Sequence, residues 1–404
     1  MDGEGVLNFI ATPPQVGEPA PFFTAATDSN DRYSLEVAAG RWIVLMAFGT
    51  LAEPAAARAF TEVVARRALF NDRDAAFFGV SVDPADRLQR GLANSEPGLR
   101  FFWDFDCRVS RLYGVADAQH LRPSLFLIDP AFRIAMAEPI ESAGAVLDRL
   151  EAALKAAPGE AETQVAPVLT LPRILEPEVC AALIACYRAG DPSASGFAKD
   201  VDGYTIQQVD PFLKRRTDVT IEDEALIEDL RLRLETRLFP MVKRAFGWQA
   251  KHIERYLICR YGAEDRGFFS RHRDDVTAGS AHRKFAVSIN LNEDFEGGDL
   301  RFPEFGPRTY RPPMGGATVF GCNLLHEATP VTRGERFVYV PFLYDAEGAR
   351  IRRANLARVA IGAQENRHMR RARAVERPKP AGLRASAPGS GSSDGLPPAP
   401  QDRA

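Results

Sequence analysis

Cysteine is scarce in this chain of 404 residues, and long apolar runs are missing altogether. The five cysteines are widely scattered and include no CxxC pair, which argues against a disulfide framework and against a zinc knuckle. No apolar stretch approaches the ~18 residues that a membrane-spanning helix requires, so we expect no membrane partner. The first residues hold no basic segment followed by an apolar one, and together with the cysteine usage this predicts a cytoplasmic protein.

Positive charge is unevenly distributed along the chain. Residues 349–404 contain eleven Arg and one Lys against four acidic residues, so this segment carries +8 while the whole chain carries −3. A basic tail can favour nucleic acid, but no recognition motif or interleaved aromatic residue accompanies these arginines, which argues against such a partner. The tail ends in a low-complexity stretch of Pro, Gly, Ser and Ala, so we predict that residues 348–404 are disordered.

The first 155 residues alternate between buried strands and helices. Apolar runs at Trp42–Phe48, Ala75–Val82 and Ser124–Ile128 predict strands, and Ala55–Leu69 and Ala143–Leu154 have helical spacing. This alternation predicts an α/β domain with crossover helices.

A linker rich in Ala, Pro and Glu at 156–169 separates that domain from a second one at 170–347. The second domain opens with helical patterns at Pro177–Ala189 and Ile221–Phe246. Phe285–Leu291 then alternates apolar and polar residues, which predicts a half-buried strand. Further short strands are predicted at Leu300–Phe302, Ala317–Phe320 and Phe337–Leu343. Helices that precede a jelly roll fit this pattern best, so we expect a two-domain chain, α/β followed by α+β.

The segment around residue 272 combines residue types that bind metals. His272 and Asp274 are two positions apart, so in an extended strand both side chains project to one face while Arg273 points away. One more imidazole would complete a 2-His-1-carboxylate triad, which holds Fe(II) and leaves coordination positions open. His326, 54 residues further on, can supply it. Arg336 follows ten residues later, where a guanidinium can take a dicarboxylate in a bidentate pair.

The order of several motifs around these residues resembles the prolyl 4-hydroxylase-like group of Fe(II)/2-oxoglutarate dioxygenases. The motifs are Tyr261–Gly262, His272–Asp274, Glu296–Pro303, Pro312–Phe320, His326–Val331 and Gly334–Arg336. The resemblance covers residues ~170–347 and implies a double-stranded β-helix, in agreement with the period-two strands.

This resemblance also implies residue roles. His272, Asp274 and His326 would bind Fe(II), and Arg336 would pair with the C5 carboxylate of 2-oxoglutarate. Tyr261 is the implied hydroxyl in the cosubstrate pocket. Ser288 is the nearest candidate for a second hydroxyl.

The implied activity is hydroxylation of a substrate C–H bond by O₂, coupled to decarboxylation of 2-oxoglutarate to succinate, with L-ascorbate restoring Fe(II). The leading substrate class is a protein or peptide, hydroxylated at a prolyl residue, and a free small molecule is the alternative. A non-catalytic two-domain binding protein with a vestigial iron site is a further alternative. The stretch Phe197–Asp218 carries no pattern from which a substrate pocket can be predicted.

The first ~155 residues resemble a peroxiredoxin-type thioredoxin-fold domain. The matching segments are Val16–Phe22, Trp42–Phe48, Phe78–Asp83, Tyr113–Val115 and Arg122–Asp129. The resemblance places Pro123 at a cis-proline position beside the active site. The peroxidatic cysteine is absent, because Phe48–Arg58 contains no thiol where these enzymes need a thiolate at a helix start.

Other histidines and cysteines are expected to be structural. Cys107 is interpreted as a buried or edge residue with no helix N-terminus and no second cysteine nearby. Cys259 and Cys322 are interpreted as small buried residues. Loop or surface positions are predicted for His120, His252, His282 and His368.

Overall fold

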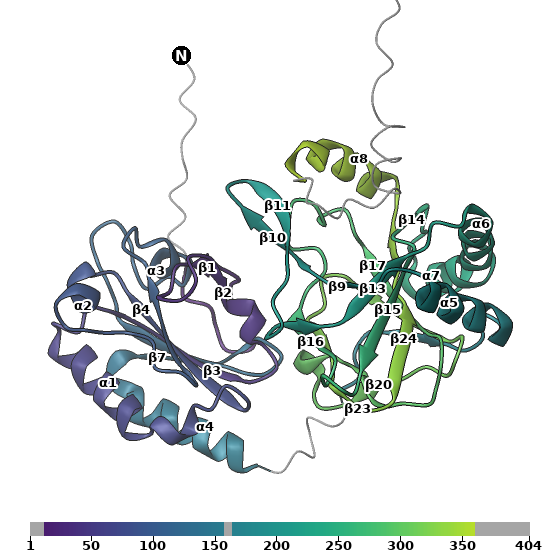
Figure 1. The fold of residues 1–404 in the computed structure, drawn as a ribbon. Coiled ribbons are helices and arrows are strands. Elements are labelled where there is room, and N and C mark those ends of the chain that lie inside the picture. Colours follow the sequence, from purple (N-terminus) through teal and green to yellow (C-terminus); the bar gives the residue numbers. More distant parts are fainter. Residues whose placement is uncertain (1–11, 157–163, 360–404) are drawn as a thin grey trace, which may run out of the picture. The chain divides into compact units, whose positions relative to one another are not determined.

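The computed structural model describes residues 12–156 and 164–359 (Figure 1). Its N-terminal part is built on a five-stranded sheet with the strand order β5-β4-β3-β6-β7. The strands are β3 (Trp42–Gly49), β4 (Ala75–Ser81), β5 (Leu99–Trp103), β6 (Ser124–Ile128) and β7 (Ile134–Pro139). The first three run parallel, and β6 and β7 are added antiparallel. The three predicted strands are therefore confirmed.

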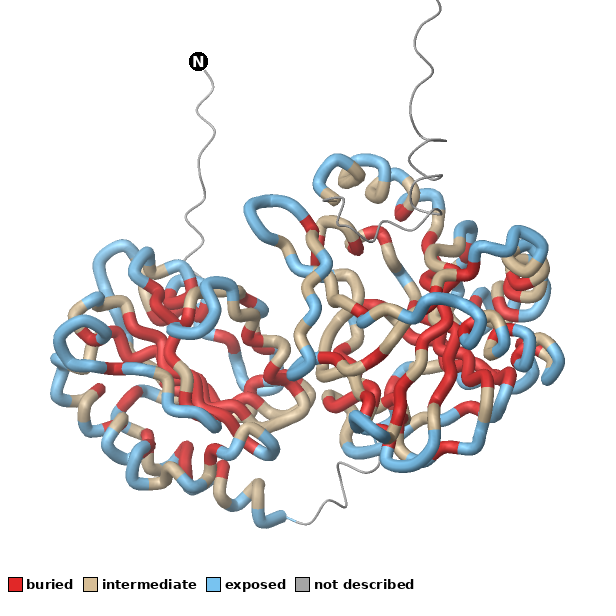
Figure 2. The backbone as a smooth tube through the Cα atoms, viewed as in Figure 1, coloured by how far each residue is buried: buried red, intermediate tan, exposed pale blue. Residues whose placement is uncertain are grey.

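Helices cover both faces of this sheet because its central strands are apolar on both sides. Every residue of β4 is buried, and Figure 2 shows the burial running along the central strands. The helices α1 (Pro54–Ala65) and α4 (Ala143–Lys155) pack together on one face (Figure 1). The remaining elements are β1 (Thr24–Ala25), β2 (Tyr33–Ser34), η1 (Leu35–Ala38), η2 (Arg67–Leu69), α2 (Pro84–Leu88), α3 (Arg108–Leu112) and η3 (Ile140–Ser142). This arrangement confirms the predicted α/β organisation.

The C-terminal part contains two antiparallel sheets. The larger follows the path β14-β25-β17-β24-β15-β13-β9, and β21 joins it between β17 and β8. Its strands are β8 (Leu169–Leu171), β9 (Ser193–Ala194), β13 (Thr217–Thr220), β14 (His252–Glu254), β15 (Leu257–Gly262), β17 (Phe285–Asn290), β21 (Ala317–Gly321), β24 (Glu335–Tyr339) and β25 (Phe342–Tyr344). The smaller sheet has the order β12-β16-β22-β19-β20. Its strands are β12 (Lys214–Arg215), β16 (Phe268–His272), β19 (Leu300–Arg301), β20 (Thr309–Tyr310) and β22 (His326–Ala328).

Two further strand pairs and several helices complete the described C-terminal part. The pairs are β10 (Phe197–Val201) with β11 (Tyr204–Gln208), and β18 (Glu296–Gly297) with β23 (Val331–Arg333). The predicted helix Pro177–Ala189 is confirmed as α5, with proline at its first position. The predicted helix 221–246 begins later, because Asp223 caps it by accepting from the backbone of residues 225 and 226. It comprises α6 (Glu224–Arg233), a π-helical turn (Leu234–Leu238) and α7 (Phe239–Phe246).

The two faces of the larger sheet differ in chemistry. Ile258, Ile289 and Tyr339 point to one face and belong to the apolar core that α5, α6 and α7 cover. Their neighbours in the strands point to the other face, and these include the polar side chains of Tyr261, Ser288, Asn290 and Arg336, all buried. The prediction of a half-buried β17 was therefore wrong, since its polar side chains face the protein interior instead of solvent.

The structure corrects two further expectations. Residues 193–220 form the strands β9 to β13, although no strand was predicted there. The tail was expected to be disordered from residue 348, yet α8 (Ala346–Asn355) and a 3₁₀ turn, η7 (Leu356–Arg358), occupy its start. Asp345 caps α8 through the Gly348 amide and also accepts from the Trp248 indole at 2.8 Å, which fixes the helix start. The rest of the tail and His368 lie outside the described residues, and the predicted domain boundaries stay a prediction.

Candidate metal centre and cosubstrate pocket

Strand pairing brings the two histidines of the predicted triad together. His272 ends β16 and His326 begins β22, and the two residues are direct partners in the ladder between these strands. Asp274 lies in the turn that follows β16, where its amide donates to the Cys322 carbonyl at 2.9 Å. The antiparallel pairing of β16 with β22 thus brings together two histidines that are 54 residues apart in the sequence.

The three side chains converge on a common point. Asp274 Oδ1 lies 3.6 Å from His272 Nε2, and Asp274 Oδ2 lies 3.4 Å from His326 Nε2. In the described ranges this is the one group of three or more His, Cys, Asp or Glu residues with ligand atoms all within 4.8 Å of one another. Two nitrogens and one oxygen on one side of a site match the donor set that Fe(II) takes in a facial triad.

Backbone carbonyls set the tautomer of both imidazoles. His272 Nδ1 lies 2.7 Å from the Ser270 carbonyl, and His326 Nδ1 lies 3.0 Å from the Leu324 carbonyl. Because a carbonyl oxygen only accepts, each Nδ1 carries the proton and each Nε2 keeps its lone pair. Both lone pairs are therefore available to a metal, and the carbonyls act as the orienting partners that metal-bound histidines need.

Burial and mutual charge keep His326 and Asp274 in the protonation states that a metal requires. Burial lowers the pKa of His326 to about 4, and His272 adds to this effect, so His326 is neutral at physiological pH. Burial alone would raise the pKa of Asp274, but the two imidazoles outweigh it and hold that pKa well below its usual range. An ionised carboxylate and a neutral imidazole bind a divalent cation without first releasing protons.

Arg336 is a buried cation without a carboxylate partner. It lies on β24 and is only 3% exposed. Its guanidinium donates to Ser288 Oγ at 3.0 Å and to Asn290 Oδ1 at 2.9 and 3.1 Å. Within the described part of the chain, no carboxylate oxygen lies within 4.0 Å of it. Burial lowers its pKa, and a charge in this position favours an anionic ligand that would compensate it.

Tyr261 stands between two guanidinium groups. Arg336 Cζ lies 5.6 Å from the centre of its ring, and Arg216 Cζ lies 5.7 Å from it. Arg216 Nη1 also approaches the Tyr261 hydroxyl at 3.4 Å. Arg216 is matched by Asp218, with contacts of 2.7 and 2.8 Å between the guanidinium and the carboxylate. Burial raises the pKa of Tyr261, so the hydroxyl stays protonated.

Sequence reasoning found part of this pocket and missed the rest. It pointed to Ser288, which the structure places against Arg336, but it overlooked Asn290 two positions later. It also found no pocket signal in the stretch that contains Arg216 and Asp218. The structure corrects this, because it buries Arg216 beside Tyr261 and pairs it with the half-buried Asp218. Their alternation within Arg216-Thr217-Asp218 was the available signal, because polar residues two apart on a strand share a face.

A further hydroxyl on the same inner face has no partner. Thr318 lies opposite Ser288 in the pairing of β17 with β21, and its Oγ1 is buried without a hydrogen bond to any described residue. A buried polar group of this kind is costly unless a ligand or water satisfies it. Thr318, Ser288 and Arg336 together offer donors for one carboxylate.

The N-terminal part holds a carboxylate network where a peroxiredoxin-type enzyme would hold its thiol. In the connection between β3 and α1, Thr50 Oγ1 donates to Asp83 at 2.8 Å and the Leu51 amide donates to Asp86 at 3.1 Å. Asp86 is fully buried and also accepts from Ser81 Oγ at 2.7 Å and from Arg90 at 2.8 Å. The donors to Asp86 thus come from the β3–α1 connection, from the end of β4 and from the residues that follow α2.

Two expectations for the N-terminal part need correction. Cys107 does stand at a helix start, because it caps α3 with a positive φ of 56°. Burial and then Asp104 raise the pKa of its thiol, so this position does not activate it. The bond before Pro123 is trans, contrary to the expected cis-proline, and the cis bond of the described residues is Glu96–Pro97.

The remaining histidines and cysteines lie largely as expected. Cys259 and Cys322 are buried, and His120 and His252 are exposed. His282 lies in a loop as predicted, but it is buried and its Nε2 is 2.8 Å from Glu254. No helix in the described ranges combines the length and apolarity that crossing a membrane requires.

Comparison with known proteins identifies both parts of the chain. A PKHD-type hydroxylase of Synechococcus sp. is 28% identical over 82 residues, which are 19% of this chain and 37% of that protein. The multifunctional procollagen lysine hydroxylase and glycosyltransferase of Rattus norvegicus is 30% identical over 117 residues, 27% of this chain and 15% of that protein. A solved prolyl-4-hydroxylase of Pseudomonas putida has a TM-score of 0.32 and 18% identity, covering 46% of this chain and 95% of that chain.

The chain thus spans well under half the length of these two curated relatives. Residues 16–137 match the AhpC/TSA family, and residues 256–344 match the 2OG-Fe(II) oxygenase superfamily. Both resemblances drawn from the sequence are confirmed by these matches. The chain therefore joins an N-terminal AhpC/TSA domain of thioredoxin-like fold to a C-terminal domain of the 2OG-Fe(II) oxygenase superfamily.

Proposed function

We propose that this protein is an Fe(II)- and 2-oxoglutarate-dependent dioxygenase that hydroxylates a C–H bond of its substrate. The observation that carries the proposal is a His272–Asp274–His326 triad on the same domain as a buried Arg336 that lacks a carboxylate partner. The triad provides ligands for a divalent metal ion such as Fe(II), and the arginine provides a partner for a carboxylate of 2-oxoglutarate. Together the two features match the metal and the cosubstrate of such an enzyme.

Fe(II) with 2-oxoglutarate, when bound, supplies the oxidising power for hydroxylation, and the cosubstrate leaves as succinate and CO₂. The chain's own residues hold and orient these groups. Arg336 pairs with the C5 carboxylate, while Ser288 and Asn290 fix the plane of its guanidinium. The Thr318 hydroxyl, which otherwise lacks a partner among the described residues, donates to the same carboxylate.

The substrate class proposed first is a protein or peptide, with a prolyl residue as the position oxidised. The name of the procollagen lysine hydroxylase among the relatives supports a protein substrate, although it names lysine and not proline. A free small molecule is the second candidate. L-ascorbate is proposed as the reductant that restores Fe(II), and O₂ as the second cosubstrate. We also propose that the protein acts in the cytoplasm.

The direct test is release of succinate from 2-oxoglutarate by the full chain, with Fe(II), O₂ and ascorbate and without added substrate. Uncoupled turnover of this kind should depend on both Fe(II) and 2-oxoglutarate. The vestigial-site alternative predicts instead that one equivalent of Fe(II) binds and no succinate forms.

The AhpC/TSA domain is proposed to serve binding or stability instead of peroxide reduction. Its β3–α1 connection contains no thiol, and the carboxylate of Asp86 occupies the neighbourhood with its hydrogen bonds satisfied. A thioredoxin-like domain that has lost its nucleophilic thiol can still bind a partner through its surface, but it cannot reduce a peroxide through that thiol.

A further inference from the structure

The strand segment that leads into β13 carries two buried cations. Lys214 and Arg216 are two residues apart and both lie on the inner side, where they are 5% and 9% exposed. Arg216 is neutralised by Asp218 through two short contacts. Lys214 has no carboxylate oxygen within 4.0 Å among the residues described, so its charge is left without a counterion.

The ammonium group of Lys214 is only partly satisfied. Its Nζ donates to the Gly196 carbonyl at 2.8 Å and lies 4.3 Å from the centre of the Phe269 ring. An ammonium has three donors, and a carbonyl with an aromatic face does not compensate a full charge. Burial lowers the pKa of Lys214, and the neighbouring Arg216 lowers it further. An anion next to Nζ would raise the pKa of Lys214 again, and so oppose the effects of burial and of Arg216.

Lys214 lies one aromatic ring away from the metal centre. The Phe269 ring stacks on the His272 imidazole, with 3.5 Å between ring centres and 21° between planes. The imidazole occupies one face of Phe269, so the ammonium lies over the other. Lys214 and Phe269 are also direct partners in the pairing of β12 with β16, which fixes this arrangement.

The charges of the pocket leave one cation unmatched after cofactor loading. Asp218 matches Arg216, and a 2-oxoglutarate dianion with Asp274 matches Fe(II) and Arg336. Among Fe(II), Arg216, Arg336 and Lys214, only Lys214 then lacks an anion, and Arg255 adds further positive charge that acts on it. Burying such a charge is unfavourable unless another ligand supplies an anion.

We propose that Lys214 binds a carboxylate of the substrate to be oxidised, so that the substrate class is carboxylic acids. The proposal rests on the proposed dioxygenase function. The carboxylate belongs either to a free amino or organic acid, or to an acidic side chain or C-terminus of a peptide. Since Phe269 separates Lys214 from His272, the oxidised carbon lies several bonds away from the carboxylate.

The test compares each probe acid with its own amide. The probes are N-acetyl-L-proline and N-acetyl-L-prolinamide for free acids, and the peptide acetyl-Gly-Pro-Gly as acid and as amide for peptides. A third peptide pair exchanges an internal Glu for Gln. Binding to the full chain loaded with Mn(II) and 2-oxoglutarate is measured by calorimetry, and stimulation of succinate release is measured with Fe(II).

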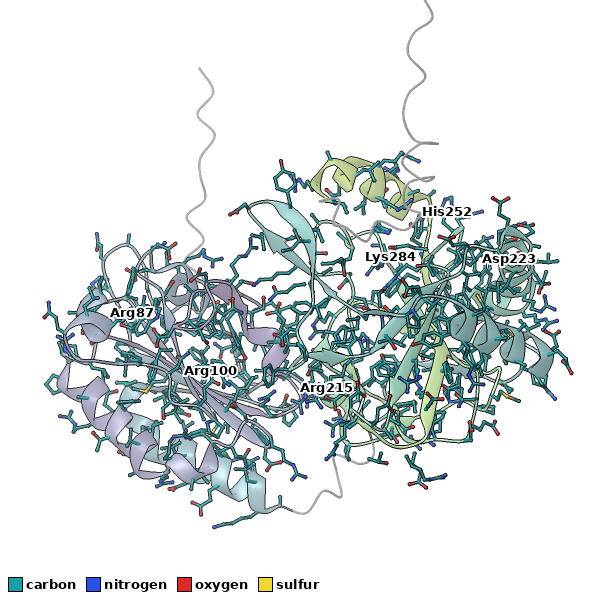
Figure 3. All side chains as sticks on the ribbon, viewed as in Figure 1. Arg87, Arg100, Arg215, Asp223, His252 and Lys284 are labelled. Carbon is teal, nitrogen blue, oxygen red and sulfur yellow. The ribbon has the colours of Figure 1, made fainter. Side chains whose placement is uncertain are left out.

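We expect the acid of at least one pair to bind about 10- to 100-fold more tightly than its amide, as a charged hydrogen-bond partner does. This preference should fall to near unity in Lys214→Met and persist in Lys214→Arg. Arg215→Met is the matched control, because Arg215 (labelled in Figure 3) is the adjacent cation and its guanidinium donates instead to the carbonyls of Pro211 and Asp265. The pair that responds identifies the free-acid or the peptide source.

Three results would overturn the proposal. One is an acid preference that survives in Lys214→Met, and another is the absence of any acid preference in the wild-type protein. The third is a rise in the KM for 2-oxoglutarate in Lys214→Met as large as that in Arg336→Ala, which would assign Lys214 to the cosubstrate. Failure of the proposed dioxygenase function would give a different result: the wild-type protein would bind Mn(II) but release no succinate in the presence of Fe(II).

Discussion

Replacing Arg336 by Ala should weaken 2-oxoglutarate binding much more than it weakens the fold. The guanidinium donates three hydrogen bonds to the neutral oxygens of Ser288 and Asn290 and has no carboxylate neighbour in the described ranges. Its charge is therefore matched only when the cosubstrate is bound. Removing one partner of a buried charged pair costs about 2–5 kcal/mol, which corresponds to about 30- to 5,000-fold in affinity.

The assay is the KM for 2-oxoglutarate in uncoupled succinate release at saturating Fe(II). Arg336→Lys should fall between wild type and Arg336→Ala, because an ammonium keeps the charge but loses the bidentate geometry. Arg333→Ala is the control, since Arg333 lies on the neighbouring strand β23, is exposed, and pairs with Glu296 at 2.8 Å. An unchanged KM in Arg336→Ala would refute the reasoning and point to another cation, Arg260 or Arg333, as the carboxylate partner.

Thermal unfolding gives a second readout of the same substitution. A buried cation without a carboxylate partner contributes little to stability, so Arg336→Met should leave the Tm of the protein without cosubstrate close to that of wild type. Adding 2-oxoglutarate with Mn(II) should then raise the Tm of wild type by mass action and that of the variant much less. A large loss of Tm in the variant without cosubstrate would mean that the hydrogen bonds to Ser288 and Asn290 hold the sheet together.

Three further predictions follow from individual groups. His326→Ala should abolish both Fe(II) binding by calorimetry and succinate release, and full turnover in this variant would contradict the triad. Asp218, whose pKa is lowered to about 2 by Arg216 despite its burial, should contribute roughly 2 kcal/mol of stability above its ordinary pKa. Since its folded-state pKa is depressed, that contribution is lost as pH falls from about 4 towards 2, so the difference in unfolding free energy between wild type and Asp218→Asn should shrink over this range. The full chain should consume no peroxide with dithiothreitol, and Cys107→Ser should change nothing; peroxide consumption that Cys107→Ser removes would contradict this.

The sequence predicted the framework of the fold because its strands and helices have strong local patterns. The run Trp42–Phe48 and the helix Pro177–Ala189 were recognisable from apolar spacing and a proline at a helix start. Among the strands missed at residues 193–220, β9, β12 and β13 are short, and the charged side chains of Lys214 and Arg216 face the protein interior, while β10 and β11 are only partly buried. A charged residue inside a strand normally indicates the solvent face, and this rule fails where the interior is a polar pocket.

The site residues that a local sequence motif marks were predicted, and those without such a motif were missed. His272, Asp274, His326 and Arg336 were found because a motif fixes their spacing, and the pairing of β16 with β22 then brings both histidines to one point. Asn290 has no such motif. Its role depends only on its hydrogen bond to Arg336, which lies on a different strand. The pairing register that brings the two residues together cannot be predicted from a single sequence.

We expect the AhpC/TSA domain to be inactive towards peroxides, both because the β3–α1 connection lacks a thiol and because its carboxylate network is internally satisfied. Asp86 is fully buried, and it accepts from the Leu51 amide, from Ser81 and from Arg90. A network whose members are all satisfied rigidifies its surroundings. We therefore expect no peroxidase chemistry at the β3–α1 connection, although the sheet that supports it is intact. Whatever this domain contributes to the oxygenase must come from its outer surface, which is why we expect its removal to alter substrate recognition or stability and to leave uncoupled succinate release in place.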